Sequence, residues 1–220
     1  MVTDDSTPSQ AAKQAPSIQR RGRKFDQVLE GASKLFMSQG FEATSVDDIA
    51  REASVSKATI YSYFPDKRLM FSEVVRTECQ RQTEAAGEPV APGSPPEKAL
   101  YQIARQIMGT YISEVSQQMF RICVAEAARF PELGKLFYES GPLSVRAEVL
   151  AYLQEAQAAG QFTIGDLELA AEQFVELCKA DLLLRAVFLH ERDFSEEEQD
   201  RVARAAVGMF LARHRPNAAL

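Results

Sequence analysis

Residues 44–67 decide the fold of this chain, and they read T-S-V-D-D-I-A-R-E-A-S-V-S-K-A-T-I-Y-S-Y-F-P-D-K. The first half predicts a short helix that begins at Ser45, or with Thr44 as its N-cap, and ends near Ala53. The second half predicts a helix of about two turns that begins after the N-cap Ser56. Because only a few residues separate the two helices, they meet at a tight turn, as in a helix-turn-helix.

The second of these helices has hydroxyl, amine and phenol groups on its surface and no acidic side chain. Ile60 and Phe64 are four residues apart and face inward, so the polar residues take the outer faces. The outward residues are Ser56, Lys57, Thr59, Tyr61, Ser62 and Tyr63. Such groups suit the phosphates and base edges of a DNA major groove. The alternative is that they are ordinary exposed side chains.

The stretch closely resembles the DNA-binding domain of the tetracycline-repressor (TetR) family, over residues 25–71. The resemblance rests on the G-F-x-x-T-S-V-x-x-I-A run at 40–50, the V-S-K-A-T-I-Y-x-Y-F run at 55–64, and a lysine at 67. Ser54 and Ala58 depart from it, since the family often has glycine at both positions. A serine holds the turn at small cost if its backbone is not left-handed, and Ala58 can alter the base preference.

The resemblance assigns roles to single residues. Ser45, Thr59, Tyr61 and Lys67 match positions that hold phosphates. Lys57 and Tyr63 match positions that can touch base edges, although Lys57 can instead bind phosphate alone and Tyr61 can be partly a packing residue. Ala58 can contact a thymine methyl group. Together with Ser56 and Ser62, these residues form the predicted DNA-binding set.

Composition points to an all-α protein with two tasks. Of the 220 residues, 45% are apolar, which is enough for a core, and helix formers dominate. The net charge is −6, but residues 13–81 carry 12 Lys/Arg against 9 Asp/Glu, and residues 82–220 carry 13 against 20. This asymmetry indicates a basic reading head and an acidic remainder, unless it is a chance fluctuation. We expect a three-helix helix-turn-helix domain followed by a helical bundle, with about nine to ten helices in all.

Breaks in the pattern predict the organisation along the chain. Residues 1–22 form a polar arm, 23–70 the DNA-binding domain, 71–94 a connecting helix with a Pro/Gly-rich linker, and 95–220 a regulatory and dimerising domain. Outside the helix-turn-helix, helices are expected over about 23–38, 66–86, 95–114, 116–129, 131–139, 143–159, 166–190 and 195–213. Ser94 and Ser195 are the expected caps of two of them, each with a capping-box glutamate.

The arm ends in basic residues, Arg20, Arg21 and Arg23. Such an arm can enter a minor groove. The equally weighted alternative is a solvated tail.

The resemblance implies that residues 95–220 bind a small, largely apolar effector and form a homodimer. Candidate ligand-binding residues are Met108, Tyr111, Phe120, Phe137, Tyr138 and Cys178, each of which can instead be core. Candidate dimer contacts are Phe174, Leu182, Val202, Ala206, Met209 and Phe210, which can instead pack within one chain. The implied function is that of a repressor that a ligand releases from a palindromic, double-stranded DNA operator.

Other classes of protein have little support in the sequence. The alternatives are an all-α small-molecule-binding protein or an enzyme without a DNA-binding role, a metal sensor, or a purely structural interaction protein. The two histidines and three scattered cysteines form no ligand cluster or catalytic motif, so we expect no metal and no cofactor. The polar N-terminus, the unpaired cysteines and the absence of a long apolar run predict a cytoplasmic protein without a membrane partner.

Overall fold

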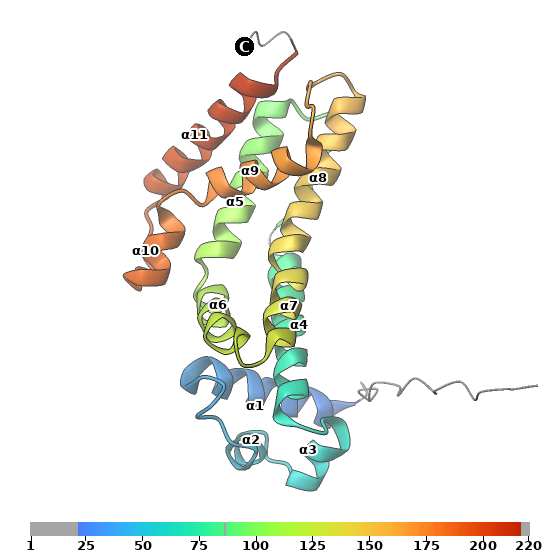
Figure 1. The fold of residues 1–220 in the computed structure, drawn as a ribbon, viewed down its shortest axis with the longest axis vertical. Coiled ribbons are helices and arrows are strands. Elements are labelled where there is room, and N and C mark those ends of the chain that lie inside the picture. The colour runs from blue at the N-terminus through green and yellow to red at the C-terminus, as the bar shows by residue number, and fades with distance from the viewer. Residues whose placement is uncertain (1–21, 86, 217–220) are drawn as a thin grey trace, which may run out of the picture.

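The computed structural model describes residues 22–216 apart from residue 86, and within them the chain is all-helical. The helices are α1 (Arg23–Gln39), α2 (Val46–Glu52), α3 (Lys57–Tyr63), α4 (Lys67–Ala85), α5 (Pro96–Ile112), α6 (Glu114–Ala127), α7 (Pro131–Ser140), α8 (Pro142–Ala158), α9 (Leu167–Cys178), α10 (Leu182–Phe188) and α11 (Glu196–His214). The described part of the molecule is elongated, with α1–α3 at one end and the C-terminal end of α11 at the other (Figure 1). The predicted all-α class is confirmed.

The small end of the molecule is a head built on α1. The apolar residues of α1 recur every three or four positions and are buried against α2, α3 and α4. This stripe consists of Phe25, Val28, Leu29, Ala32, Leu35 and Phe36. Helix α4 begins after Asp66, whose carboxylate accepts from the backbone N–H of Leu69 at 2.9 Å, as the sequence predicted.

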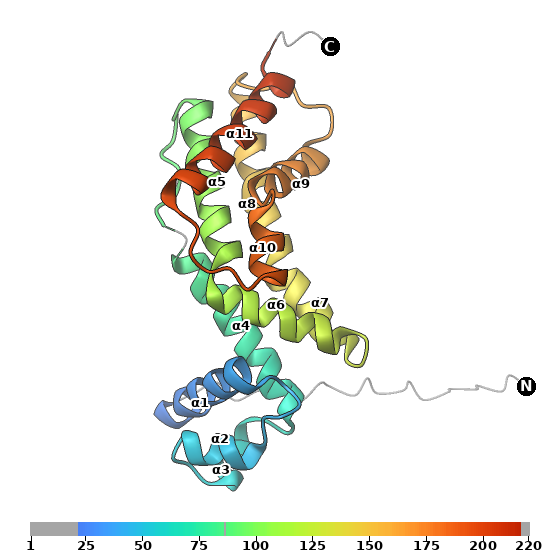
Figure 2. The same ribbon diagram turned by 90° about the vertical axis from the view of Figure 1, so that its left-hand side faces the viewer.

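The large end is a bundle in which α5 packs on α11 and α8 packs on α9. Helix α9 also contacts α5 and α11, so the three helices share one core with α8. Phe174 lies in this core with its ring centroid 5.1 Å from that of Phe210. The side of the bundle formed by α9, α10 and α11 faces the viewer in Figure 2.

Helices α6 and α7 join the head to the bundle. Helix α7 packs along α4, and α6 contacts α1 (Figure 1). Met119, Cys123 and Leu133 come from these two helices and belong to the same buried cluster as the core of the head. The head and the α6–α7 corner are therefore one packed unit.

The single helix expected over 166–190 is wrong, because the chain breaks between α9 and α10. At the break, the backbone N–H of Leu182 bonds to the carbonyl of Ala180 at 2.8 Å. Asp181 between them has φ 64° and ψ −49°, the geometry of a classic γ-turn. The division of this segment raises the number of helices in the described residues to eleven.

The two predicted caps in the second half of the chain have different outcomes. Ser195 forms the predicted capping box with Glu198 at the start of α11. The prediction for Ser94 is wrong: the N-cap of α5 is Pro95, and no side chain caps that helix. Pro96 at the first helical position explains why, since it has no N–H that needs a partner.

Candidate nucleic-acid interface and ligand cavity

Serine caps position the two short helices of the head. The Oγ of Ser45 accepts from the backbone N–H of Asp48 at 3.1 Å and so begins α2. The Oγ of Ser56 accepts from the backbone N–H of Thr59, also at 3.1 Å, and begins α3. Both hydroxyls are exposed. The hydroxyl of Ser45 also donates to the carboxylate of Asp48, and the hydroxyl of Ser56 shares a hydrogen bond with that of Thr59. Each cap thus fixes the residue that starts its helix.

The turn between α2 and α3 is a Schellman motif. Ser54 has φ 53°, the backbone N–H of Val55 bonds to the carbonyl of Ala50 at 3.0 Å, and that of Ser54 bonds to the carbonyl of Arg51 at 3.2 Å. We expected a serine to hold this turn at a small conformational cost only if its backbone were not left-handed. The backbone of Ser54 is left-handed, so that expectation is not met. Gly31 of α1 lies opposite, and a Cβ there would come within 3.2 Å of the backbone of Ala53.

Helix α3 buries one face and leaves the other open to solvent. Ile60 and Phe64 are fully buried in the head. Lys57, Ala58, Tyr61 and Ser62 are exposed, and Thr59 and Tyr63 are half-buried. The helix lies at the end of the molecule farthest from α11 (Figure 1). Its open face is the candidate DNA-reading surface.

Further residues of the predicted DNA-binding set, beyond the two capping serines, have partners within the chain. The ammonium of Lys57 lies 2.5 Å from a carboxylate oxygen of Asp47 on α2, in an exposed ion pair. The ring of Tyr63 packs edge-on against Phe25, with centroids 5.6 Å apart. The Oγ of Ser62 donates to the carbonyl of Thr59 at 2.6 Å. Of these, Tyr63 is the one whose packing helps to hold α3 on α1.

The ammonium group of Lys67 is held by contacts within the chain and is not free to contact a phosphate in the way that the resemblance implies. Its ammonium donates to the carbonyl oxygens of Phe41 at 2.8 Å, Thr44 at 3.1 Å and Glu42 at 3.4 Å. It also lies 4.4 Å from the centroid of the Phe41 ring. These contacts use all three ammonium protons to fix the turn between α1 and α2.

The predicted basic arm lies mostly outside the described residues. Arg20 and Arg21 are not described. Arg23 is the exposed first residue of α1.

The junction between head and corner is aromatic and charged. The ring of Phe130, at the start of α7, meets the ring of Phe41 edge-on with centroids 5.7 Å apart. The guanidinium groups of Arg129 and Arg68 lie over Phe130, and Arg129 also pairs with Glu42. A movement of α6 and α7 would therefore be transmitted to the head through this contact.

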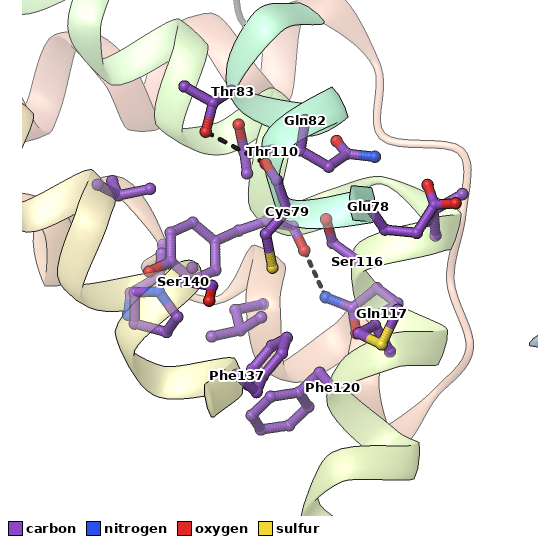
Figure 3. A pocket seen from close by; sticks show the side chains of 18 of the residues that line it. Glu78, Cys79, Gln82, Thr83, Thr110, Ser116, Gln117, Phe120, Phe137 and Ser140 are labelled. Atoms are coloured by element: carbon purple, nitrogen blue, oxygen red, sulfur yellow. Dashed lines mark hydrogen bonds between the residues drawn. The ribbon is translucent and has the colours of Figure 1, made fainter. Parts of the chain in front are cut away.

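A cavity of about 180 Å³ lies between α4, α5, α6 and the start of α8. Aromatic and aliphatic groups supply much of its wall, and Figure 3 shows Phe120 and Phe137 side by side at one end of it. Lys179 and Leu183, on either side of the α9–α10 break, also line it. The cavity thus touches the connecting helix, the corner and the bundle at once.

Three of the six predicted ligand-binding residues line this cavity, namely Tyr111, Phe120 and Phe137. Burial raises the pKa of Tyr111 to about 12, so its phenol is neutral. The other three are not among the lining residues: Met108 and Cys178 are buried in the bundle core, and Tyr138 is exposed on α7. Sequence reasoning missed the polar lining residues, above all Gln117, because a glutamine inside an amphipathic helix gives no signal of a cavity.

Five of the six predicted dimer contacts are in the wrong place. Phe174, Leu182, Val202, Ala206 and Phe210 are buried in the core of the single chain, so they are not available to a partner. Met209 alone is exposed, at 62%. Other large apolar side chains are exposed on α10 and at its C-terminal end: Leu184, Phe188 and Leu189.

No helix in the described ranges is long and apolar enough to cross a bilayer. Among the described side chains, no group of three His, Cys, Asp or Glu lies close enough together to hold a metal ion.

The fold and the site define a class of protein: a helix-turn-helix head mounted on a helical bundle that contains a cavity. Family comparison agrees for both parts. Residues 28–74 match the model of bacterial regulatory proteins of the tetR family, and residues 98–216 match the C-terminal domain of AefR-like transcriptional repressors. The chain belongs to the TetR family of transcriptional regulators, which are not enzymes.

Relatives of known structure cover nearly the whole chain. The flavonoid-responsive regulator FrrA is 39% identical with a TM-score of 0.79, and the match covers 90% of this chain and 100% of that one. A TetR-family regulator from Mesorhizobium loti MAFF303099 is 29% identical with a TM-score of 0.77, and the match covers 88% and 97%.

A curated relative matches over a shorter stretch. The uncharacterized HTH-type regulator YhgD of Bacillus subtilis (strain 168) is 37% identical over 68 residues, which is 31% of this chain and 36% of that relative.

Proposed function

We propose that the protein is a homodimeric repressor that binds a palindromic operator and is released from it by a small, largely apolar ligand. The observation that carries this proposal is the open face of α3, with Lys57, Ala58, Tyr61 and Ser62 exposed at the far end of the head. A lysine, a phenol and small side chains on one helix can approach base edges and phosphates without steric or charge conflict.

Dimerisation follows from the small footprint of one head. A single two-turn helix contacts few bases, and two heads spaced about 34–36 Å apart would read a two-fold symmetric site. The exposed apolar residues of α10, with Met209 of α11, supply the surface that the proposed partner chain would cover. In a two-fold dimer the same patch meets itself, so each of these residues acts twice.

Release by ligand is supported by the position of the cavity. Its walls include residues of α4, which enters the head, and of α6, whose corner contacts α1. A ligand shifts the spacing of the heads only if it binds one spacing more tightly than the other. A shift from 99:1 to 1:99 needs a difference of about 5.5 kcal/mol between the two states. The flavonoid-responsive relative supports an aromatic ligand.

The experiment that tests the function is selection of bound sequences from a random DNA pool with the full-length protein. We expect a two-fold symmetric site whose half-sites lie about one helical turn, 10–10.5 base pairs, or a multiple of it apart. Enrichment of no sequence, or of a single unpaired half-site, would contradict the proposal. Gel shifts of the selected site with and without ligand then measure release.

A further inference from the structure

Lys57 is the only cation of α3, and its ammonium is already engaged by a residue of α2. It is the first residue of α3 and lies on the open face that forms the candidate DNA-reading surface. Its Nζ lies 2.5 Å from Oδ1 of Asp47, and both side chains are more than half exposed, at 55% and 59%. The carboxylate of Asp47 therefore lies at the edge of the reading surface, where a bound duplex would meet it.

The next acidic residue of α2, Asp48, has a different role. Its carboxylate accepts from the hydroxyl of Ser45 at 2.6 Å and from the guanidinium group of Arg51 at 3.0 Å. Asp48 thus closes the first turn of α2, whereas Asp47 holds the cation of α3. Asp47 also lies in this first turn, where the helix dipole stabilises a negative charge.

A lysine that is paired with a carboxylate recognises DNA differently from a free lysine. A free ammonium group binds a phosphate and releases a counterion on any sequence, so it strengthens binding to all DNA. In the pair, the carboxylate offsets this charge and repels phosphate oxygens, so most of that gain is lost.

The paired ammonium group keeps its capacity to donate hydrogen bonds. It has three N–H donors, and Asp47 uses one of them, so two remain. In the major groove, guanine presents two neighbouring acceptors, N7 and O6. Adenine presents a donor beside N7, cytosine presents a donor, and thymine presents one acceptor. Guanine is therefore the base that matches the two remaining donors.

We propose that Asp47 is a positioning residue, which converts Lys57 from a phosphate contact into a reader of guanine. On a half-site with guanine at this step, the two remaining donors of Lys57 bond to N7 and O6 while the ion pair stays closed. On other sequences the pair contributes little. This inference rests on the proposed function, because it requires α3 to read an operator.

Binding of full-length Asp47→Asn to the selected operator, to its single-base variants and to random DNA tests the proposal. The change frees Lys57 to bind phosphate, so the salt dependence of binding to random DNA should steepen by about 0.9 for each head. The preference for guanine at one step of each half-site, roughly 5–150-fold for a good contact with two hydrogen bonds, should fall to a few-fold. An unchanged salt slope or an unchanged preference would overturn the proposal.

Glu52→Gln is the matched control on the same helix. Glu52 is the last residue of α2 and pairs with Lys34 of α1 at 2.5 Å. The control removes the same charge from the head, so it should change the affinities for operator and random DNA by similar factors and keep the guanine preference. Loss of that preference in the control as well would show that general charge sets the specificity, which would overturn the proposal.

A double substitution decides whether Asp47 acts through Lys57. Lys57→Met keeps an unbranched side chain but lacks the ammonium group. In that background, Asp47→Asn should change neither the salt slope nor the base preference further. A slope that steepens by the same amount in both backgrounds would show that Asp47 acts by its own charge, and the positioning role would be wrong.

The selection experiment separates this inference from the proposed function. If no two-fold symmetric site is enriched, both fail. If such a site is enriched but its guanine preferences are the same in Asp47→Asn and in the unmodified protein, the proposed function stands and the role of Asp47 fails.

Discussion

At the scale of single residues, Ser54 has an unfavourable backbone conformation. A non-glycine residue in the left-handed region costs roughly 1–2 kcal/mol, and φ of Ser54 is 53°. We expect Ser54→Gly to raise the free energy of unfolding by about 0.5–1 kcal/mol, since the extra freedom of glycine in the unfolded chain offsets part of the gain. Urea unfolding would show this as a higher midpoint with an unchanged slope.

A matched control for that change is Ser62→Gly, in the right-handed helix α3. It should lower the free energy of unfolding by about 0.5 kcal/mol, because glycine is the poorer helix former. Stabilisation by both substitutions, or by neither, would contradict the role of the Ser54 backbone.

Lys67 provides a test between a structural and a phosphate-binding role. Lys67→Met keeps most of the side chain but leaves the carbonyls of Phe41 and Thr44 without their donor. We expect the free energy of unfolding to fall by about 1–3 kcal/mol, with little change in the salt dependence of DNA binding. Unchanged stability with a salt slope smaller by about one would instead assign Lys67 to a phosphate.

Lys57 is the exposed cation of α3, and it pairs with Asp47 of α2. If it reads a base edge, Lys57→Ala should relax specificity at one base step, at a cost of about 1–3 kcal/mol on the operator and less on random DNA. Equal losses on both DNAs would place it on phosphate. Lys98→Ala, the same change far away on α5, should leave both affinities unchanged.

At the scale of elements, the short helices of the head were predictable because their signals are local. Ser45, Ser56 and Asp66 each precede a helix and cap it in the structure. The break between α9 and α10 was not predictable in this way. Residues 179–181 contain neither glycine nor proline, so the break depends on tertiary packing rather than on a local signal.

The apolar faces of α9 and α11 show a second limit of sequence reasoning. Periodicity marks which residues of a helix are buried, but it does not say whether they are buried by the same chain or by a partner. Val202, Ala206 and Phe210 are covered within the chain. The residues that remain open, on α10, lie in the segment that was expected to continue a longer helix.

Helix α10 is therefore the element to alter when dimerisation is tested. Phe188 is 74% exposed, and a buried aromatic residue is a frequent source of binding energy in an interface. We expect Phe188→Ser to weaken the dimer by about tenfold to a hundredfold, as measured by sedimentation equilibrium. Val124→Ser, an exposed apolar residue on α6, is the control and should leave the dimer intact. A dimer of unchanged stability in Phe188→Ser would exclude this face.

At the scale of the whole molecule, Phe130 sits where the corner meets the head. Phe130→Ala removes the ring that contacts Phe41 and lies under Arg68 and Arg129. We expect ligand affinity and ligand-free operator affinity to stay within about threefold of the original. The change in operator affinity that a bound ligand causes, typically about 5–150-fold for coupled sites, should fall towards onefold.

The control for Phe130 is Tyr138→Ala, which removes an exposed ring from α7, the helix that follows Phe130. Gel shifts with and without ligand should show coupling unchanged in that variant. Loss of coupling in both variants, or in neither, would show that signal transfer does not run through the Phe130 contact.

The class of the molecule was predictable from one dense motif, whereas its cavity was not. The residues of the motif are close in sequence, so their spacing alone defines the head. The cavity draws on Cys79, Gln117, Gly141 and Lys179, which are far apart in the sequence and come together only after folding. Three aromatic lining residues were found because large apolar side chains are the default wall of a pocket.

The shared core of the head and the α6–α7 corner limits how such proteins can be recombined. A chimaera that grafts residues 22–94 onto another regulator's bundle would lose Met119, Cys123 and Leu133 from beneath the grafted piece. The chimaera would keep the operator preference of α3. Its solubility would depend on whether side chains of the new bundle fill the space left beneath the grafted head. Exchanges of DNA specificity should therefore carry residues 114–140 along with the head.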